Sequence, residues 1–178
     1  VVLYGVNNEM CGNDITQENP TMWINGIGTF CHEFSHCLGL PDVYDTNYGS
    51  TPTMGKWDLM AHGSYNGPED IGWCPAPWTS YERRFAGWLE PVEPQPGDTI
   101  RGVRSLCNGG TPYIIYNDGH KDEYFLLENH DGKGWDAYTP EKGLLVIHVD
   151  YDSVLFANNI VNSTGSFTRD KGYDGDFT

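Results

Sequence analysis

Residues 30–45 read FCHEFSHCLGLPDVYD and contain two histidines, His32 and His36, four positions apart. In an α-helix such residues lie on one face, one turn apart, so the two imidazoles can converge on one point. Imidazole nitrogen is a common zinc ligand. Glu33 directly follows the first histidine, beside the expected metal. A carboxylate there can accept a proton from a water molecule acidified by zinc and pass it to a leaving amine.

A catalytic zinc site needs a third protein ligand, and the residues after His36 can supply it. Gly39 can end the helix with a left-handed turn, and Pro41 cannot continue a helix. Asp42 can then return toward the metal, where a carboxylate oxygen is an acceptable zinc ligand. Two imidazoles, one carboxylate and an open position for water make a catalytic site, not a closed structural one. HExxH alone also arises by chance, but HExxHxxGxxD is much more specific.

The helix that must carry both histidines is predicted over residues 24–38. Glycine and proline at its end agree with the reversal that Asp42 requires. Apolar side chains recur there at steps of three and four residues and form one stripe: Ile27, Phe30, Cys31, Phe34 and Leu38.

The remaining elements of the first half are less regular. Residues 1–6 resemble a buried strand, and residues 7–22 are polar and rich in turn formers. Residues 43–76 are expected to form loops. A second helix is predicted within APWTSYERRFAGWL, with Pro77 in its first turn and Gly87 near its end.

The proline-rich EPVEPQPGD, residues 90–98, marks the expected boundary between two regions. Residues 1–90 would form the catalytic region, and residues 91–178 a β-rich segment that continues it or packs on it. The segments TPYIIYND, DEYFLLENH and GLLVIHVDYD are predicted strands separated by turns. The predicted fold class is therefore α/β (α+β).

Composition narrows the range of partners. The chain has 25 acidic and 10 basic residues and a net charge of −15, which argues against nucleic acid and anionic membranes as partners. No apolar run approaches the roughly 18–20 residues of a transmembrane helix. The five cysteines form no CxxC pair, so a cysteine-based zinc site is not expected, and their pairing stays open. The opening VVLYGV is expected to belong to a mature form or a fragment.

The pattern HExxHxxGxxD resembles that of the metzincin-like zinc peptidases, in which aspartate sometimes replaces a third histidine. HEFSHCLGLPDVYD, followed by WDLMAHGSYNG at residues 57–67, is similar to the immune inhibitor A family of secreted bacterial metallopeptidases. GWLEP, EYFLLENH, WDAYTPEKGLLVIHVD and NNIVN are also similar to later segments of that family. The resemblance runs from about residue 23 to residue 162.

The resemblance implies a metzincin-like catalytic domain with one catalytic Zn²⁺ on the two histidines and Asp42, and with Glu33 as general base. Met60 would lie in the methionine turn, an apolar floor beneath the imidazoles and not itself a ligand. Several related peptidases carry a tyrosine soon after this methionine. Here His62 or Tyr65 could bind the developing oxyanion, although packing or surface roles are the simpler explanation for both.

The expected function is that of a secreted or cell-surface bacterial zinc endopeptidase acting on proteins or peptides. The acidic turn PDVYDTN could hold Ca²⁺ through Asp45, although a solvated turn is the simpler explanation. One alternative is a non-catalytic zinc-containing module that binds proteins or glycans, against which Glu33 argues because a structural site does not need it. A second alternative is a hydrolase that acts on a non-protein amide. Cleavage preference, latency and oligomeric state stay open.

Overall fold

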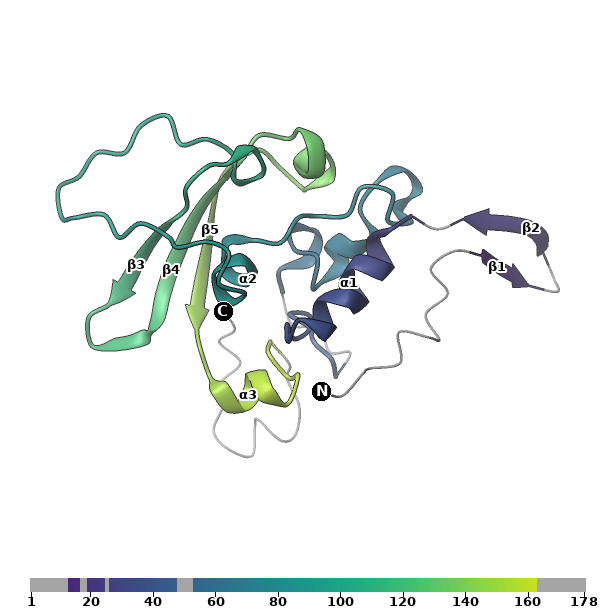
Figure 1. The fold of residues 1–178 in the computed structure, drawn as a ribbon, viewed down its shortest axis with the longest axis horizontal. Helices are drawn as coiled ribbons and strands as arrows, with labels where there is room; N and C mark the ends of the chain where they lie inside the picture. Colours follow the sequence, from purple (N-terminus) through teal and green to yellow (C-terminus); the bar gives the residue numbers. More distant parts are fainter. Residues whose placement is uncertain (1–12, 17–18, 25, 48–52, 163–178) are drawn as a thin grey trace.

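The computed structural model describes residues 13–16, 19–24, 26–47 and 53–162, which form a mixed α/β fold (Figure 1). A three-stranded antiparallel sheet lies on one side of helix α1, and short helices and loops connect them. The predicted α/β class is confirmed at this level. The strand predicted at residues 1–6 lies outside the described residues.

Helix α1 (Gly28–Cys37) carries the HEFSH motif. It begins later than predicted, because Ile24 ends strand β2 (Asn19–Ile24). Gly39 follows the helix in a left-handed conformation with φ 92°, so the chain reverses where the sequence predicted. An apolar stripe on a helix usually faces the protein interior, but the stripe on α1 does not. His32 and Ser35 are buried, whereas four apolar residues at and beside the helix are exposed: Ile27, Phe30, Phe34 and Leu38.

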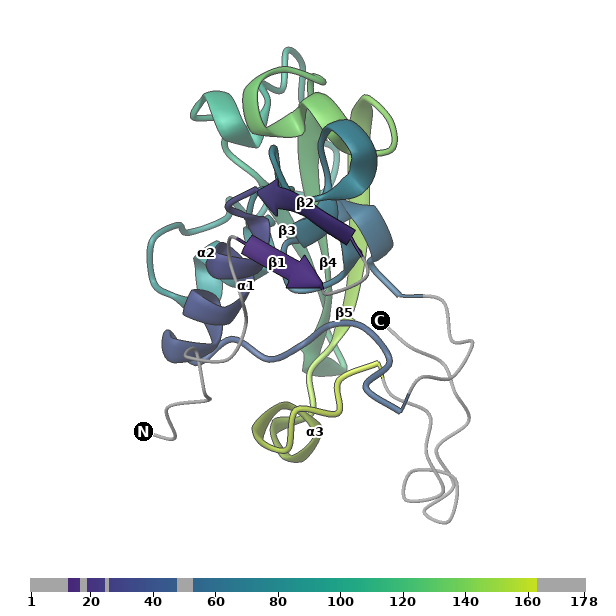
Figure 2. The ribbon, with the colours of Figure 1, turned by 90° about the vertical axis from the view of Figure 1, so that its right-hand side faces the viewer.

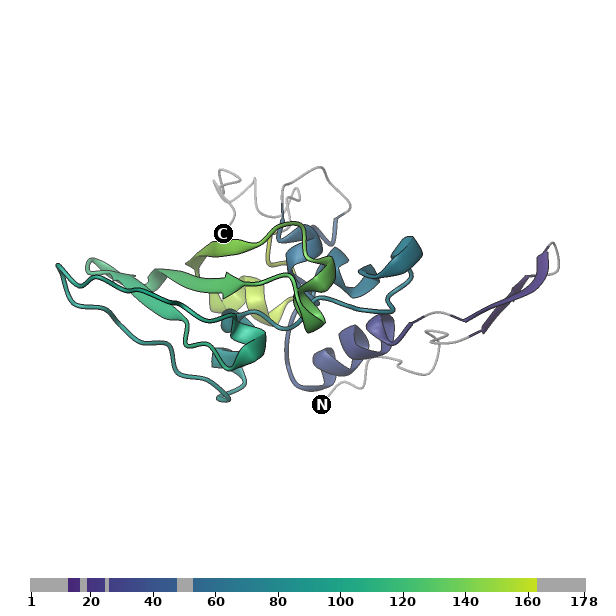
Figure 3. The same ribbon diagram turned by 90° about the horizontal axis from the view of Figure 1, so that it is seen from above.

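Strand β1 (Asn13–Thr16) pairs with β2 in an antiparallel hairpin. Figures 1 and 3 show this hairpin extending away from the rest of the described chain. The sequence showed residues 7–22 only as polar and rich in turn formers, and no strand was predicted there. The segment NDIT has one apolar residue, so its sequence lacks the alternation that predicts a strand.

The main sheet has the strand order β3-β4-β5, with both neighbouring pairs antiparallel. Its strands are β3 (Tyr113–Asn117), β4 (His120–His130) and β5 (Gly143–Asp150). Each of the three strands predicted after the proline-rich segment is present. Figure 2 shows β4 and β5 side by side along most of their length.

One face of the sheet forms the larger apolar core. Leu126 in the central strand is fully buried and pairs with Ile114 and Ile147 on its two neighbours. Because side chains alternate along a strand, Glu128 and His130 point to the same buried side as Leu126. The buried members of this core are Ile114, Tyr124, Leu126, Ile147 and Val149.

Helix α2 (Ser80–Phe85) packs against this core through Tyr81. Thr79 and Glu82 form a capping box at its N-terminus. The helix therefore begins after Thr79, and the prediction that Pro77 lies in its first turn is wrong. Gly87 follows the helix with φ 74°, as a glycine at a helix end is expected to do.

Helix α3 (Ser153–Ala157) follows β5 and was not predicted, because five residues are too few for a clear period. Asp152 caps it by accepting hydrogen bonds from the backbone amides of Val154 and Leu155. After α3 the chain returns to a second core, where Val161 packs against four buried residues: Leu40, Val43, Met60 and Ala61.

Across the described residues, no helix combines the length and apolar character needed to cross a membrane.

Candidate metal centre

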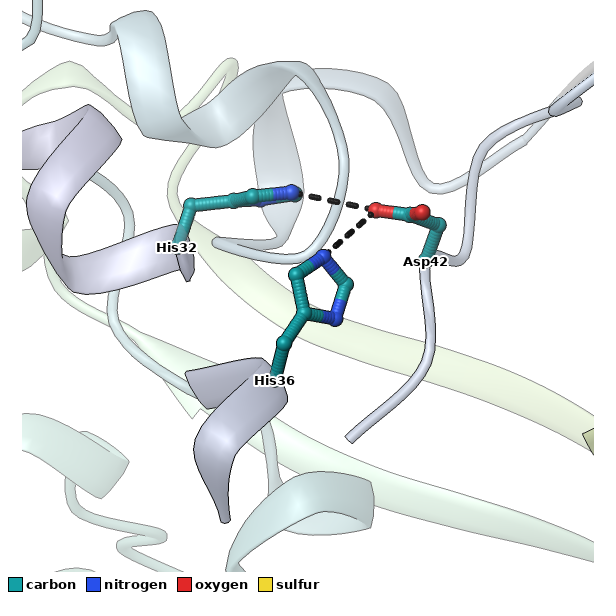
Figure 4. Close-up of side chains that lie close together, drawn as sticks. All are labelled: His32, His36 and Asp42. Carbon is teal, nitrogen blue, oxygen red and sulfur yellow. Dashed lines mark ion pairs between the residues drawn. The ribbon is translucent and has the colours of Figure 1, made fainter. Parts of the chain in front are cut away.

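His32, His36 and Asp42 meet at the end of α1 (Figure 4). The Nε2 atoms of His32 and His36 lie 3.0 and 3.2 Å from the same oxygen, Oδ1 of Asp42. The two rings are perpendicular, with an interplanar angle of 89°. Within the part of the chain that the structure describes, this is the one group of three or more side chains placed to share a metal ion.

Backbone carbonyls determine which nitrogen of each ring carries hydrogen. His32 Nδ1 lies 2.8 Å from the carbonyl oxygen of Leu59, and His36 Nδ1 lies 2.8 Å from that of Leu40. A carbonyl can only accept, so each Nδ1 donates its hydrogen and each Nε2 is left with a lone pair. Metal-binding histidines commonly have their second nitrogen held in this way.

When both rings are neutral, the lone pairs of their Nε2 atoms therefore face a carboxylate oxygen. Asp42 Oδ1 is buried and has no hydrogen-bond donor, although two ring nitrogens are close to it. Buried polar atoms rarely lack a partner, so a proton or a metal ion is required between these three atoms. Zinc bonds of about 2.0–2.1 Å in a tetrahedron would place the ligand atoms about 3.3 Å apart, so the donor set fits zinc.

The pKa shifts of Asp42 and His36 agree with this need for positive charge. Burial raises the pKa of Asp42, but the rings of His32 and His36 and the amide of Asn159 outweigh burial and bring it well below the usual range. Burial lowers the pKa of His36, whereas Asp42 and the Leu40 carbonyl raise it, and the net change is upward. Asp42 is therefore a carboxylate that favours a cation beside it.

The segment 58–61 is hydrogen-bonded to His32 and to the chain that follows Asp42. Met60 is fully buried, its amide donates to Asp58 Oδ1 at 2.6 Å, and its carbonyl accepts from the amide of Val43 at 3.0 Å. The neighbouring Leu59 supplies the carbonyl that holds His32. The chain after the zinc motif is thus hydrogen-bonded to the segment that contains Met60. The geometry is compatible with a methionine turn, and that role stays a prediction.

Glu33 lies beside the cluster on the same helix and is half-buried. Its charge contributes to the raised pKa of His36, which places it within electrostatic reach of the site. It is not part of the three-residue group itself. A carboxylate beside a metal site and outside the ligand set is free to exchange protons with water.

The two candidates for oxyanion contact are not in the cluster. Tyr65 is 50% exposed, and His62 is also exposed. The His62 ring packs edge-on against Tyr44 at 6.3 Å, and Tyr44 in turn stacks on His32 at 6.3 Å. Tyr44 thus contacts both the His62 ring and the His32 ring, and no sequence pattern indicated these contacts.

Asp45, the candidate for calcium, is buried and accepts a hydrogen bond from the amide of Asn47 at 3.0 Å. It belongs to no group of metal-binding side chains among the described residues. Calcium usually takes six to eight oxygen ligands. Calcium at Asp45 stays a prediction that this geometry does not strengthen.

Two sets of buried or site-contacting residues were missed by the sequence interpretation. Asn159 hydrogen-bonds Asp42 from 117 positions away, and such a distance leaves no pattern in a single sequence. Glu128, His130 and Asp136 form a buried charged group. The alternation in EYFLLENH, which puts Glu128 and His130 on the face of Leu126, could have indicated that group.

Comparison with known proteins agrees with the sequence motif. Residues 6–88 match the family model described as immune inhibitor A peptidase M6, catalytic domain. A protein of Arthroderma benhamiae named as a secreted metallopeptidase is 45% identical over 47 residues, covering 25% of this chain and 7% of that protein. No solved structure matches the chain.

Two bacterial relatives also match the chain over short segments. The Pre-pro-metalloprotease PrtV of Vibrio cholerae is 39% identical over 59 residues, covering 33% of this chain and 6% of the relative. Immune inhibitor A of Bacillus thuringiensis subsp. alesti is 32% identical over 74 residues, covering 38% of this chain and 11% of the relative. The chain therefore spans about a tenth or less of the length of these relatives.

Proposed function

From the resemblance of residues 6–88 to the immune inhibitor A peptidases, we propose that the chain carries the zinc site of a secreted or cell-surface endopeptidase. The observation that supports this most directly is the buried Oδ1 of Asp42, which lacks a donor and faces the Nε2 atoms of His32 and His36. The proposed fold is metzincin-like, with Met60 as the apolar floor. Protein or peptide substrates and Zn²⁺ are part of the proposal.

A zinc ion held by these ligands would act as a Lewis acid on the substrate carbonyl and lower the pKa of water to about 7. Glu33 would accept a proton from the attacking water as the oxygen of that water bonds to the peptide carbonyl carbon. Glu33 would then return that proton to the amide nitrogen as the C–N bond breaks. The carbonyls of Leu59 and Leu40 keep both imidazoles in the metal-binding tautomer throughout.

The test separates zinc binding from catalysis. Glu33→Gln keeps the size of the side chain and removes its basicity, so zinc content should equal that of the wild type. We expect kcat/KM on fluorescent casein to fall by about 10²- to 10⁴-fold, the usual contribution of a general base. Glu141→Gln, the same change at an exposed position, should leave both quantities unchanged.

Three results would contradict the proposal or one of its parts. Zinc-loaded wild type that cleaves neither casein nor a peptide library would leave a non-catalytic zinc module. Full turnover in Glu33→Gln would remove Glu33 from the mechanism. Loss of zinc from Glu33→Gln would instead place Glu33 among the ligands.

A further inference from the structure

The side chain of Asn159 contacts Asp42 twice. Its Nδ2 donates to Oδ2 of Asp42 at 2.6 Å, and its Oδ1 accepts from the backbone amide of Asp42 at 2.6 Å. One carboxamide therefore holds both the carboxylate and the backbone of the same residue. Two such contacts fix the position of Asp42 and the rotation of its carboxylate.

The two carboxylate oxygens of Asp42 therefore have different partners. Oδ1 faces the imidazoles of His32 and His36, and Figure 4 shows the other oxygen turned away from both rings. Asn159 binds that second oxygen, Oδ2. The carboxylate can offer one oxygen to a metal without rotating, so it is already ordered as a monodentate ligand.

Asn159 is itself held firmly. Its backbone lies in the left-handed region, with φ 55°, where asparagine is better tolerated than most residues. Its carbonyl accepts from Thr46 Oγ1 at 3.2 Å, and its amide donates to the carbonyl of Phe156 in α3 at 3.2 Å. Asn162 adds a further connection by donating from Nδ2 to the carbonyl of Val43 at 2.9 Å.

We propose that Asn159 is a positioning residue for the metal site, which holds Asp42 in the orientation that binds zinc. This inference depends on the zinc site proposed above. Hydrogen-bond partners behind a metal ligand typically change metal affinity by about 10- to 100-fold when they are removed. The segment after α3, outside the residues that match the family model, would then form part of the active centre.

The test is the zinc dissociation constant, measured by competition with a chelator. Asn159→Gly removes the carboxamide and keeps a backbone that tolerates a positive φ. We expect its zinc affinity to be about 10- to 100-fold lower than that of the wild type. In the Co²⁺-substituted protein, the visible absorption bands should also change, because a freely rotating carboxylate alters the coordination of the metal.

Asn162→Gly is the matched control, since Asn162 also has a positive φ, 58°, and also donates to the same loop. It removes an equivalent contact without touching Asp42, and its zinc affinity should stay within about threefold of the wild type. Equal losses in the two variants would mean general anchoring of the loop and would overturn the proposal. So would wild-type affinity in Asn159→Gly.

Melting temperatures in excess chelator show whether each variant folds without metal. If Asn159→Gly does not fold, Asn159→Ser replaces it, because a hydroxyl can make one of the two contacts but not both. Wild-type affinity in that variant would also refute the inference. A wild-type protein that binds no zinc refutes the proposed function, whereas zinc binding that is insensitive to Asn159 refutes only this inference.

Discussion

At the scale of single residues, His130 is the most unusual group outside the metal centre. It is 1% exposed, its Nδ1 lies 2.9 Å from Asp136 Oδ1, and its Nε2 lies 2.8 Å from Glu128 Oε1. Both ring nitrogens face carboxylates, so the ring must be a protonated imidazolium. The two acids have further donors: the Ser105 hydroxyl binds Asp136 and the Ser80 amide binds Glu128.

The surroundings of His130 have opposing effects on its pKa. Burial lowers the pKa, but the hydrogen bonds to Asp136 and Glu128 outweigh burial and raise it to about 9. Burial raises the pKa of Asp136, and the hydrogen bonds from His130, Ser105 and Cys107 bring it down to about 2. The pair is therefore charged over most of the pH range in which proteins are studied.

These shifts predict how stability depends on pH. His130 has a higher pKa in the folded state than its ordinary 6.5, so its contribution is complete below pH 6.5 and is lost as pH rises through about 9. Asp136 contributes to stability at pH values above its ordinary pKa of 3.8, and this contribution is lost as pH falls through about 2. We expect the contribution of these two residues to the free energy of unfolding to be highest between about pH 4 and 6.5 and to fall by about 3 kcal/mol toward pH 9.

The measurement is urea denaturation across this pH range. His130→Gln should lose the decline between pH 6.5 and 9 and should be destabilised by about 3–5 kcal/mol, because it leaves buried carboxylates without their cation. His148→Gln is the control, since His148 pairs with Glu123 at 3.0 Å but both side chains are about a third exposed. An unchanged pH profile in His130→Gln would contradict the assignment.

The sequence predicted which side chains meet at the candidate metal site better than it predicted their supports. The positions of His32, His36 and Asp42 follow from the geometry of one helix and one glycine turn, which are local properties. Asn159 and Asp136 act through contacts between segments far apart in the chain, and local patterns carry no information about such contacts. Their discovery required the fold.

At the scale of elements, the close approach of α1 to the 3-10 helix His62–Tyr65 depends on a missing side chain. A Cβ atom at Gly28 would lie 1.8 Å from the carbonyl oxygen of Ser64. The amide of Gly28 also donates to the carbonyl of Gly72 at 3.0 Å. Glycine is required here for space and not for a left-handed backbone, since its φ is not positive.

Gly28→Ala should therefore force the start of α1 away from its neighbour. We expect a loss of about 2 kcal/mol or more in the free energy of unfolding, as for other overpacked positions. Gly119→Ala is the control, because its added Cβ would meet only Asn117 Oδ1 at 3.4 Å, and it should change stability by less than about 0.5 kcal/mol. Equal stability of Gly28→Ala and the wild type, measured by urea denaturation, would contradict this close packing.

Periodicity predicted the existence of α1 but not its orientation. Apolar residues at steps of three and four share a face, and this much is true of Phe30 and Phe34, whose rings stack with centroids 6.1 Å apart. Which face contacts the rest of the chain is decided by other segments. In α1, the face with His32 and Ser35 is buried because the hydrogen bonds of the metal centre and of Trp78 are made there.

At the scale of the whole molecule, buried charge connects the metal centre with the sheet. Asp58 holds the amide of Met60, and burial, followed by the charge and hydrogen bond of Glu82, raises its pKa well above the usual range. Glu128 of β4 adds to this effect and also binds the first amide of α2. Residues on both sides of the proline-rich segment thus share one buried network.

We therefore predict that the regions before and after residue 90 unfold together. Separating them would break the hydrogen bond between the Ser80 amide and Glu128 and would remove Tyr81 from the apolar core of the sheet. Thermal unfolding followed by tryptophan fluorescence and by far-ultraviolet circular dichroism should give one coincident transition. Two transitions, or a fragment of residues 1–90 that binds zinc as tightly as the whole chain, would contradict this.

The distance along the chain between Asp42 and Asn159 also affects protein synthesis. Asp42 leaves the ribosome 117 residues before Asn159, and every strand of the main sheet lies between them. If Asn159 orients the aspartate, a nascent chain would hold zinc more weakly until the segment after α3 has reached Asp42.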